Sequence, residues 1–282
     1  PYTGRSHFDG QNLMESGGHV PYQELTGWLG RGIDEAGFEG LSISLPIPLL
    51  LRGTNNSDNF FPTMMEKPSN KIMHIIADHY ASDKKLKGAM DRIQARPLSM
   101  TESVMGRNKI HRDFSFLTGI AGAQMAKPNG PRVAVFEVFG FDTHAAQGGR
   151  NGLLDQKLGV IDEIFSGLRL ALGDNFDNTI ILTLTEFGRT LKENGGYGTD
   201  HGYGTAIMLA GGLLKKSQIY TDWPGLQPQN LFEGRDLLAT IDSRSVYCSA
   251  MSHCFDLDFE RLRRNVFWNV PLTNLSDSLF NV

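Results

Sequence analysis

Fold class follows from two apolar, β-rich runs, Val133-Ala134-Val135-Phe136-Glu137-Val138 and Thr179-Ile180-Ile181-Leu182-Thr183-Leu184-Thr185, and from what lies between them. Runs of this composition are typical of strands buried on both faces of a parallel sheet. Between them, from Leu154 to Leu172, apolar residues recur in steps of four and three, which marks one face of a helix. Strand, helix and strand in this order predict a right-handed βαβ unit. The chain is therefore expected to be an α/β protein with a mostly parallel central sheet and helices on both faces.

Further elements are predicted on either side of this unit. Helices are expected over residues 22–31, 72–93, 114–125 and 244–255, and strands over residues 41–51 and 206–210. No internal repeat or long linker separates them. Residues 1–282 are therefore expected to form a single domain.

The composition excludes several classes of protein. Of the 282 residues, 40% are hydrophobic and 21% are charged, a balance typical of globular proteins. The most apolar run, residues 41–51, is broken by two prolines and is too short for the roughly 20 residues of a membrane span. A net charge of -4 gives no overall attraction to nucleic acid, so no nucleic-acid partner is expected. Cys248 and Cys254 lie on one predicted helix, so we expect two buried thiols without a disulfide bridge.

Polar side chains follow the predicted strands at the point where each strand ends. Ligands of open α/β sheets bind outside the carboxyl ends of the strands. Carboxylates and imidazoles together suit divalent ions such as Zn²⁺ or Mn²⁺. The candidate metal ligands are Asp142 and His144 after the first run, Glu186 after the second, and Asp200 and His201 in a glycine-rich loop.

Each of these residues also has a structural interpretation. The aspartates could satisfy backbone amides, and the glycine-rich loop could be a mobile surface segment. Arg189 could bind a tetrahedral oxyanion or form an ion pair with a nearby carboxylate. The remaining histidines divide into His74, His79, His111 and His253, which are interpreted as structural, and His19, which stays undecided.

Six strings, taken in order, resemble the bacterial domain-of-unknown-function family 1501, which is placed in the alkaline phosphatase and sulfatase superfamily. The resemblance covers nearly the whole chain. The strings are Arg5-Ser6-His7-Phe8, Gly27-Trp28-Leu29-Gly30-Arg31, Phe141-Asp142-Thr143-His144 with Gln147-Gly148, Thr185-Glu186-Phe187-Gly188-Arg189, Gly198-Thr199-Asp200-His201-Gly202 and Asp222-Trp223-Pro224-Gly225-Leu226.

This resemblance implies an alkaline phosphatase-like core with one or two divalent cations that clamp a phosphate or sulfate ester. Asp142 and His144 would serve one cation, Glu186 would take the place of the aspartate in an Asp-His-Gly motif, and Asp200 or His201 would supply a later ligand. The resemblance makes Ser6 the nucleophile, with His7 beside it, and Arg189 a stabiliser of charged oxygens.

The sequence departs from the superfamily in two places. Phe187 stands where a histidine ligand is expected, and the first aspartate ligand has no counterpart before Pro1. The second departure indicates that the N-terminal strand of the core is missing and that the chain is truncated. Family members commonly carry twin-arginine export signals, so the resemblance implies a periplasmic or extracellular location.

Three functions stay open at this point. The first is a metal-dependent hydrolase of small phosphate or sulfate esters. The second is a catalytically inactive relative that serves as an exported binding or structural subunit, with Phe60-Phe61 as a candidate contact for a protein partner. The third is a sugar-processing enzyme that uses Asp142 and Glu186 as paired carboxylates.

Overall fold

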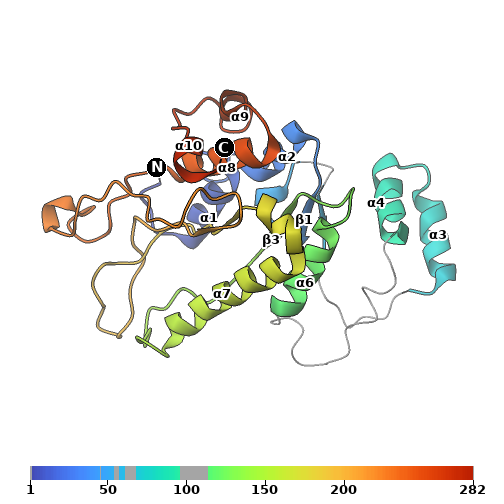
Figure 1. Cartoon of the computed structure of the whole chain (residues 1–282). Helices are drawn as coiled ribbons and strands as arrows, with labels where there is room; N and C mark the ends of the chain where they lie inside the picture. The colour runs from blue at the N-terminus through green and yellow to red at the C-terminus, as the bar shows by residue number, and fades with distance from the viewer. Residues whose placement is uncertain (1, 45, 54–56, 61–67, 96–113, 282) are drawn as a thin grey trace.

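The computed structural model describes residues 2–44, 46–53, 57–60, 68–95 and 114–281. Within these ranges the protein is a mixed α/β structure with nine α-helices and two small sheets (Figure 1). The α/β class is therefore confirmed. The sheets have three and two strands, which is less than the central sheet expected from the sequence.

The larger sheet is parallel and is formed by strands that lie far apart in the sequence. Its strands are β1 (Gly40–Ile43), β2 (Ser57–Asn59) and β3 (Val133–Phe136), in the order β2-β1-β3. β1 is the central strand, with Gly40 opposite Ser57 of β2 and opposite Val133 of β3. All four residues of β1 are buried, as expected for the middle strand of a covered sheet.

Two helices that lie side by side cover this sheet (Figure 1). They are α6 (Phe114–Met125), which has the predicted bounds, and α7 (Leu153–Leu172), which begins one residue earlier than predicted. Their apolar faces meet β1 in a cluster of buried side chains, formed by Leu41, Ile43, Leu117, Ala121, Ile164, Leu168 and Leu172. Phe60 packs against this cluster, and Phe61 lies outside the described residues.

The predicted βαβ unit is wrong in its second strand. β4 (Ile181–Leu182) pairs with β5 (Leu209–Ala210) in a separate, antiparallel sheet, whereas the neighbour of β3 is β1. The physical reason lies in the connection between β4 and β5, because residues 183–208 form loops and turns without a crossover helix. A chain that returns without such a crossover pairs antiparallel with the strand that it left.

Three other predicted elements have different bounds. The strand expected over residues 41–51 ends after β1 and is followed by η1 (Leu49–Leu51), because Pro46 and Pro48 have no N–H to donate to a strand ladder. The helix expected over residues 72–93 is two helices, α3 (Asn70–Tyr80) and α4 (Lys84–Ala95), and Asp83 accepts the Leu86 amide at the start of the second. The helix expected over residues 22–31 is α2 (Trp28–Ala36), which begins after Gly27.

The second core lies around α8 (Ser243–Phe255), which was predicted to within one residue. α1 (His7–Ser16), α2, α9 (Phe259–Asn265) and α10 (Ser276–Leu279) are the other helices of this part of the molecule (Figure 1). Trp28 stacks on Tyr247, with 4.7 Å between ring centroids, and Leu262, Val266 and Phe267 are fully buried. Short 3-10 turns, η3 (Gly173–Asn178) and η4 (Pro228–Asn230), connect the remaining segments.

The cysteine prediction is half right. Both thiols are free, and Cys248 is buried at 0% exposure, but Cys254 is exposed. Cys254 lies in the last turn of α8, where none of residues 252–255 is buried, whereas Cys248 lies among the buried residues of its middle. In the part of the chain that the structure describes, no helix is long and apolar enough to cross a membrane.

Candidate metal centre

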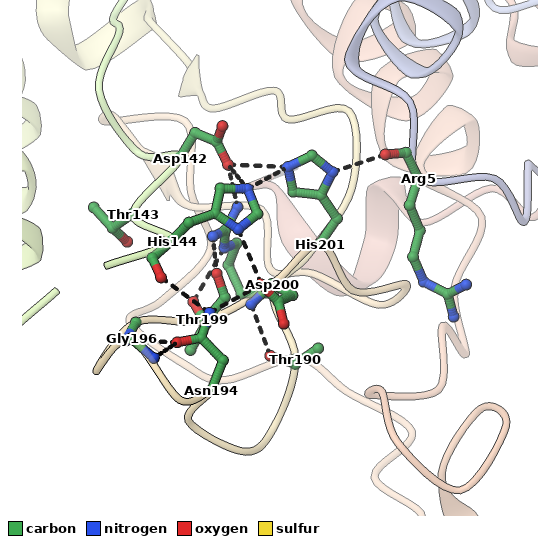
Figure 2. A network of polar contacts seen from close by, with 12 residues as sticks. Arg5, Asp142, Thr143, His144, Thr190, Asn194, Gly196, Thr199, Asp200 and His201 are labelled. Atoms are coloured by element: carbon green, nitrogen blue, oxygen red, sulfur yellow. Dashed lines mark hydrogen bonds and ion pairs between the residues drawn. The ribbon is translucent and has the colours of Figure 1, made fainter. Parts of the chain in front are cut away.

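Three loops and the start of one helix bring the predicted site residues together. His7 is the first residue of α1, and Asp142 and His144 lie in the loop after β3. Glu186 and Arg189 lie after β4, and Asp200 and His201 lie in the loop that leads to β5. Figure 2 shows Asp142, His144, Asp200 and His201 facing one another in this cluster.

The Asp142 carboxylate is the centre of the cluster. Its Oδ1 lies 2.8 Å from Nε2 of His144 and 3.0 Å from Nε2 of His201 (Figure 2). Its Oδ2 lies 3.2 Å from Nε2 of His7. The Nε2 atoms of His144 and His201 are themselves only 3.0 Å apart. Three imidazoles from different segments therefore direct the same ring nitrogen toward one carboxylate.

The other nitrogen of each imidazole faces an oxygen that can only accept a hydrogen bond. Nδ1 of His7 lies 2.7 Å from Oε1 of Glu186, and Nδ1 of His144 lies 3.0 Å from Oδ1 of Asp200. Nδ1 of His201 lies 2.7 Å from the carbonyl oxygen of Arg5 (Figure 2). An Nδ1–H in each ring donates a hydrogen bond to that oxygen. A neutral ring with its proton on Nδ1 presents the Nε2 lone pair to Asp142, whereas a protonated ring donates a second hydrogen bond from Nε2 to Asp142.

With the rings neutral and protonated at Nδ1, the Nε2 lone pairs and the carboxylate form a set of donor atoms that fits a divalent metal ion. A ring nitrogen of His7, a carboxylate oxygen of Asp142 and a ring nitrogen of His201 lie within 4.8 Å of one another. Ligand atoms about 2.1 Å from one tetrahedral ion would be about 3.4 Å apart, close to the contacts in this cluster. Imidazole and carboxylate donors suit Zn²⁺ or Mn²⁺. Histidine ligands whose second nitrogen donates to a carboxylate or carbonyl are the usual arrangement around a bound metal.

Arg189 lies against the same carboxylate. Its Nη1 is 2.6 Å from Oδ1 of Asp142, its Nε donates to Oγ1 of Thr199 at 3.1 Å, and its Nη2 donates to the Thr199 carbonyl oxygen. Of the two interpretations of Arg189 from the sequence, the ion pair with a nearby carboxylate is the one that the structure contains.

Charges in the cluster shift two pKa values in opposite directions. Burial alone would raise the pKa of Asp142, but hydrogen bonds from Arg189, His201 and His7 outweigh it and hold this pKa well below its usual range. Burial alone would lower the pKa of His7, but hydrogen bonds to Glu186 and Asp142 together raise it. The carboxylate therefore stays ionised, and the His7 ring favours a positive charge beside it.

Asn194, which the sequence analysis did not identify, organises the glycine-rich loop. Its Nδ2 donates to the His144 carbonyl oxygen and to Oδ1 of Asp200, both at 2.9 Å (Figure 2). Its Oδ1 accepts the amides of Gly196 and Gly198 at 2.9 and 3.1 Å. A Cβ at Gly198 would collide with the His144 carbonyl group, so this close approach requires glycine. The Asn194-Gly195-Gly196 turn is the sequence signal that could have pointed to this residue.

Two further residues singled out in the sequence lie beside the cluster. Phe187 packs against His7 and His201, with 4.9 and 4.5 Å between ring centroids, and so forms an apolar wall of the centre. Ser6 caps α1, and its Oγ accepts the Asp9 amide at 3.5 Å. Ser6 therefore lies at the N-terminus of the helix that begins with His7.

The other described histidines make their contacts elsewhere in the molecule. His74 and His79 are exposed on α3, His253 stacks on Phe280, and His111 lies outside the described residues. His19 is exposed, and its Nε2 lies 3.3 Å from Nη1 of Arg244.

Comparison with known protein families shows the family to which the chain belongs. Residues 64–258 match the family described as proteins of unknown function (DUF1501), and the chain belongs to that family. The matched region contains Asp142, His144, Glu186 and His201, and His7 lies before it. Neither the curated proteins nor the solved structures that were compared include a match.

Proposed function

We propose that this protein is a metal-dependent hydrolase of phosphate or sulfate esters. The observation that carries the proposal is the convergence of three imidazole Nε2 atoms, each with its Nδ1 fixed by an acceptor, on the Asp142 carboxylate. His7, Asp142 and His201 are the proposed ligands of one Zn²⁺ or Mn²⁺ ion. His144, whose Nε2 lies 3.0 Å from Nε2 of His201, is the proposed further ligand beside them. The number of ions, one or two, is part of what the experiment below measures.

In this proposal Glu186 and Asp200 act through the imidazoles that they hold. Each accepts the Nδ1 proton of a ligand, Glu186 from His7 and Asp200 from His144. A carboxylate in this position fixes the ring orientation and makes the opposite nitrogen a stronger donor to a metal.

Ser6 is the proposed nucleophile because of its place at the start of α1. The positive end of a helix of ten residues faces its hydroxyl group and favours a developing negative charge there. The Ser6 oxygen forms a bond to phosphorus or sulfur while the ester oxygen leaves as the alcohol, and a water molecule then releases phosphate or sulfate. When bound, the metal ion supplies positive charge for the ester oxygens and lowers the pKa of the attacking group.

The exposure of the centre supports a role in binding small solutes. The Asp142 and His144 side chains are each 44% exposed, which leaves the carboxylate within reach of solvent and substrate. Arg189 neutralises part of the charge of Asp142, which favours the approach of an anionic ester. An alkaline phosphatase-like core and export to the periplasm or the cell exterior belong to the same proposal and rest on the family resemblance.

The experiment is a measurement of metal content and turnover on one set of proteins. The wild type, His201→Ala and the control His79→Ala, which removes an exposed histidine of α3, are analysed by inductively coupled plasma mass spectrometry. We expect one or two equivalents of zinc or manganese in the wild type and the control, and loss of the metal in His201→Ala. Absence of metal from all three proteins would contradict the proposal.

Turnover is then tested with 4-nitrophenyl phosphate and 4-nitrophenyl sulfate as separate substrates. Cleavage of one of them, lost in Ser6→Ala while the metal is retained, supports Ser6 as nucleophile. Cleavage that survives in Ser6→Ala assigns the attack to water. A metal-loaded protein that cleaves neither ester nor a panel of related diesters would favour the inactive binding subunit.

A further inference from the structure

One carboxylate outside the candidate metal centre is fully buried and is held by two arginines. Asp236 lies after η4, and its side chain is 0% exposed. Its Oδ2 accepts hydrogen bonds from Nε and Nη2 of Arg5 at 3.1 and 2.7 Å, and from Nη2 of Arg235 at 3.0 Å. Its Oδ1 accepts Nε of Arg235 at 2.8 Å. A buried carboxylate with two cationic partners is costly to assemble, so its place in the structure calls for a reason.

Both arginines also form hydrogen bonds with His201 of the centre. The carbonyl oxygen of Arg5 accepts the Nδ1 proton of His201 at 2.7 Å (Figure 2). Nη2 of Arg235 donates to the carbonyl oxygen of His201 at 2.8 Å. One arginine thus holds the ring of His201, and the other holds its backbone.

We infer that Asp236 is a positioning residue for His201, which acts by fixing Arg5 and Arg235 at the two ends of this histidine. With both arginines in place, Nδ1 of His201 stays on the Arg5 carbonyl oxygen and Nε2 stays directed at Asp142. The hydrogen-bond partners of the Asp236 side chain are Arg5 and Arg235, so its effect on the centre passes through them. The part of this inference that concerns metal affinity rests on the proposed function, and the part that concerns the His201 ring does not.

The neighbouring carboxylate Glu233 provides a contrast. It also binds Nη2 of Arg5, at 2.7 Å, but its side chain is 58% exposed. An exposed ion pair is screened by water and salt and holds its partners only weakly. Phe232 adds to the shielding of the pair between Asp236 and Arg5. Its ring stacks on Tyr203, with 4.0 Å between ring centroids, and its centroid lies 5.9 Å from the guanidinium carbon of Arg5. The structure therefore offers a matched pair of variants, Asp236→Asn and Glu233→Gln.

The first readout is the protonation of the His201 ring in the metal-free protein. Nitrogen NMR of protein labelled at histidine and treated with a chelator reports which ring nitrogen carries the proton, and His201→Ala assigns the signal. The wild type and Glu233→Gln are expected to show His201 protonated at Nδ1. In Asp236→Asn the two nitrogens are expected to share the proton, as in a solvated imidazole. A folded Asp236→Asn protein with the wild-type signal would overturn the inference, whatever the outcome for metal or turnover.

The second readout is Zn²⁺ affinity, measured by competition with a chromophoric chelator. Loss of an outer partner of a metal-bound histidine typically weakens metal binding by about 10- to 100-fold. Asp236 holds His201 through Arg5 and Arg235, so a loss at the lower end of this range, about 10-fold, is expected for Asp236→Asn. Glu233→Gln is expected to stay within about twofold of the wild type, as for an exposed ion pair.

A second variant covers the case in which Asp236→Asn does not fold. Arg235→Met keeps the pair between Asp236 and Arg5 and removes the bond to the His201 carbonyl oxygen, at a side chain that is 45% exposed. A measurable loss of Zn²⁺ affinity, together with a shifted His201 signal, supports the inference. Wild-type affinity and a wild-type signal in this variant would overturn it.

Discussion

The core around α8 and the centre around Asp142 are held together in different ways. In the core, Trp28, Tyr247 and Phe267 are buried and meet through ring packing. In the centre, the side chains are partly exposed and meet through hydrogen bonds and ion pairs on loops. Packing of apolar surface contributes most of the stability of a protein, whereas exposed polar contacts contribute little. Stability and chemistry therefore depend on different residues of this protein, and variants can separate them.

The largest effect on stability is expected for Trp28→Ala. This substitution removes a side chain that is 2% exposed, stacks on Tyr247 and donates a hydrogen bond from Nε1 to the Met14 carbonyl oxygen. The cost should be about 3–5 kcal/mol of unfolding free energy, as for other buried tryptophans. Equilibrium unfolding in urea measures it. A loss below about 1 kcal/mol would mean that the core does not dominate stability.

Asp142→Asn is expected to have the opposite effect, a large loss of Zn²⁺ affinity with little loss of stability. The carboxylate is the common partner of three imidazoles, so its loss should weaken Zn²⁺ binding by at least about 100-fold. Because the Asp142 side chain is 44% exposed, the unfolding free energy of the metal-free protein should change by less than about 1 kcal/mol. Isothermal titration calorimetry and urea unfolding on the same preparation test both parts. Unchanged Zn²⁺ affinity would remove the central role of this carboxylate.

Acid should act on the buried ion pair between Asp236 and Arg5. Burial alone would raise the pKa of Asp236, but hydrogen bonds from Arg235 and Arg5 outweigh it and lower this pKa. A lowered pKa stabilises the fold fully above the unfolded value of about 3.9, and this stabilisation is lost as the pH falls through the folded value. Thermal unfolding of the metal-free wild type and Asp236→Asn should therefore differ most above about pH 4, and the difference should shrink as the pH falls below that value. A difference that is independent of pH would contradict the ionised state of Asp236.

The smallest effect is expected for Glu260→Gln on the surface of α9. Glu260 is 52% exposed and pairs with Arg263 at 2.7 Å, three residues along the helix. Exposed pairs of this kind contribute about 0.5 kcal/mol or less. Urea unfolding should show a change within that range, and Zn²⁺ affinity should equal that of the wild type. A larger loss of unfolding free energy would show that surface ion pairs stabilise this fold more than exposed pairs usually do.

The bounds of several helices could be predicted more closely than the pairing of the strands. The bounds of α6 match the prediction, and those of α7 and α8 differ from it by one residue. In α7 the apolar residues recur at helical spacing over the whole length of the helix. The pairing of β4 with β5 could not be predicted, since an apolar run specifies a buried strand but not its neighbour. The break between α3 and α4 depends on a capping contact at Asp83 that an apolar stripe does not reveal.

The centre could be predicted in part for a similar reason. Asp142, His144 and Glu186 follow strand-like runs and His201 lies in a glycine-rich loop, and this placed them on loops that do meet. The contact of His7 with Asp142 depends on how α1 packs against those loops, and no local pattern encodes it. The same holds for Arg5 and Asp236, which are 231 residues apart in the sequence.

The most direct test of the central claim is X-ray absorption at the zinc edge of the Zn²⁺-loaded protein. We predict nitrogen and oxygen ligands at about 2.0–2.1 Å, with the scattering pattern of at least two imidazole rings that weakens in His7→Ala and in His201→Ala. A spectrum with oxygen ligands alone, or one that neither substitution changes, would contradict a metal centre built on Asp142.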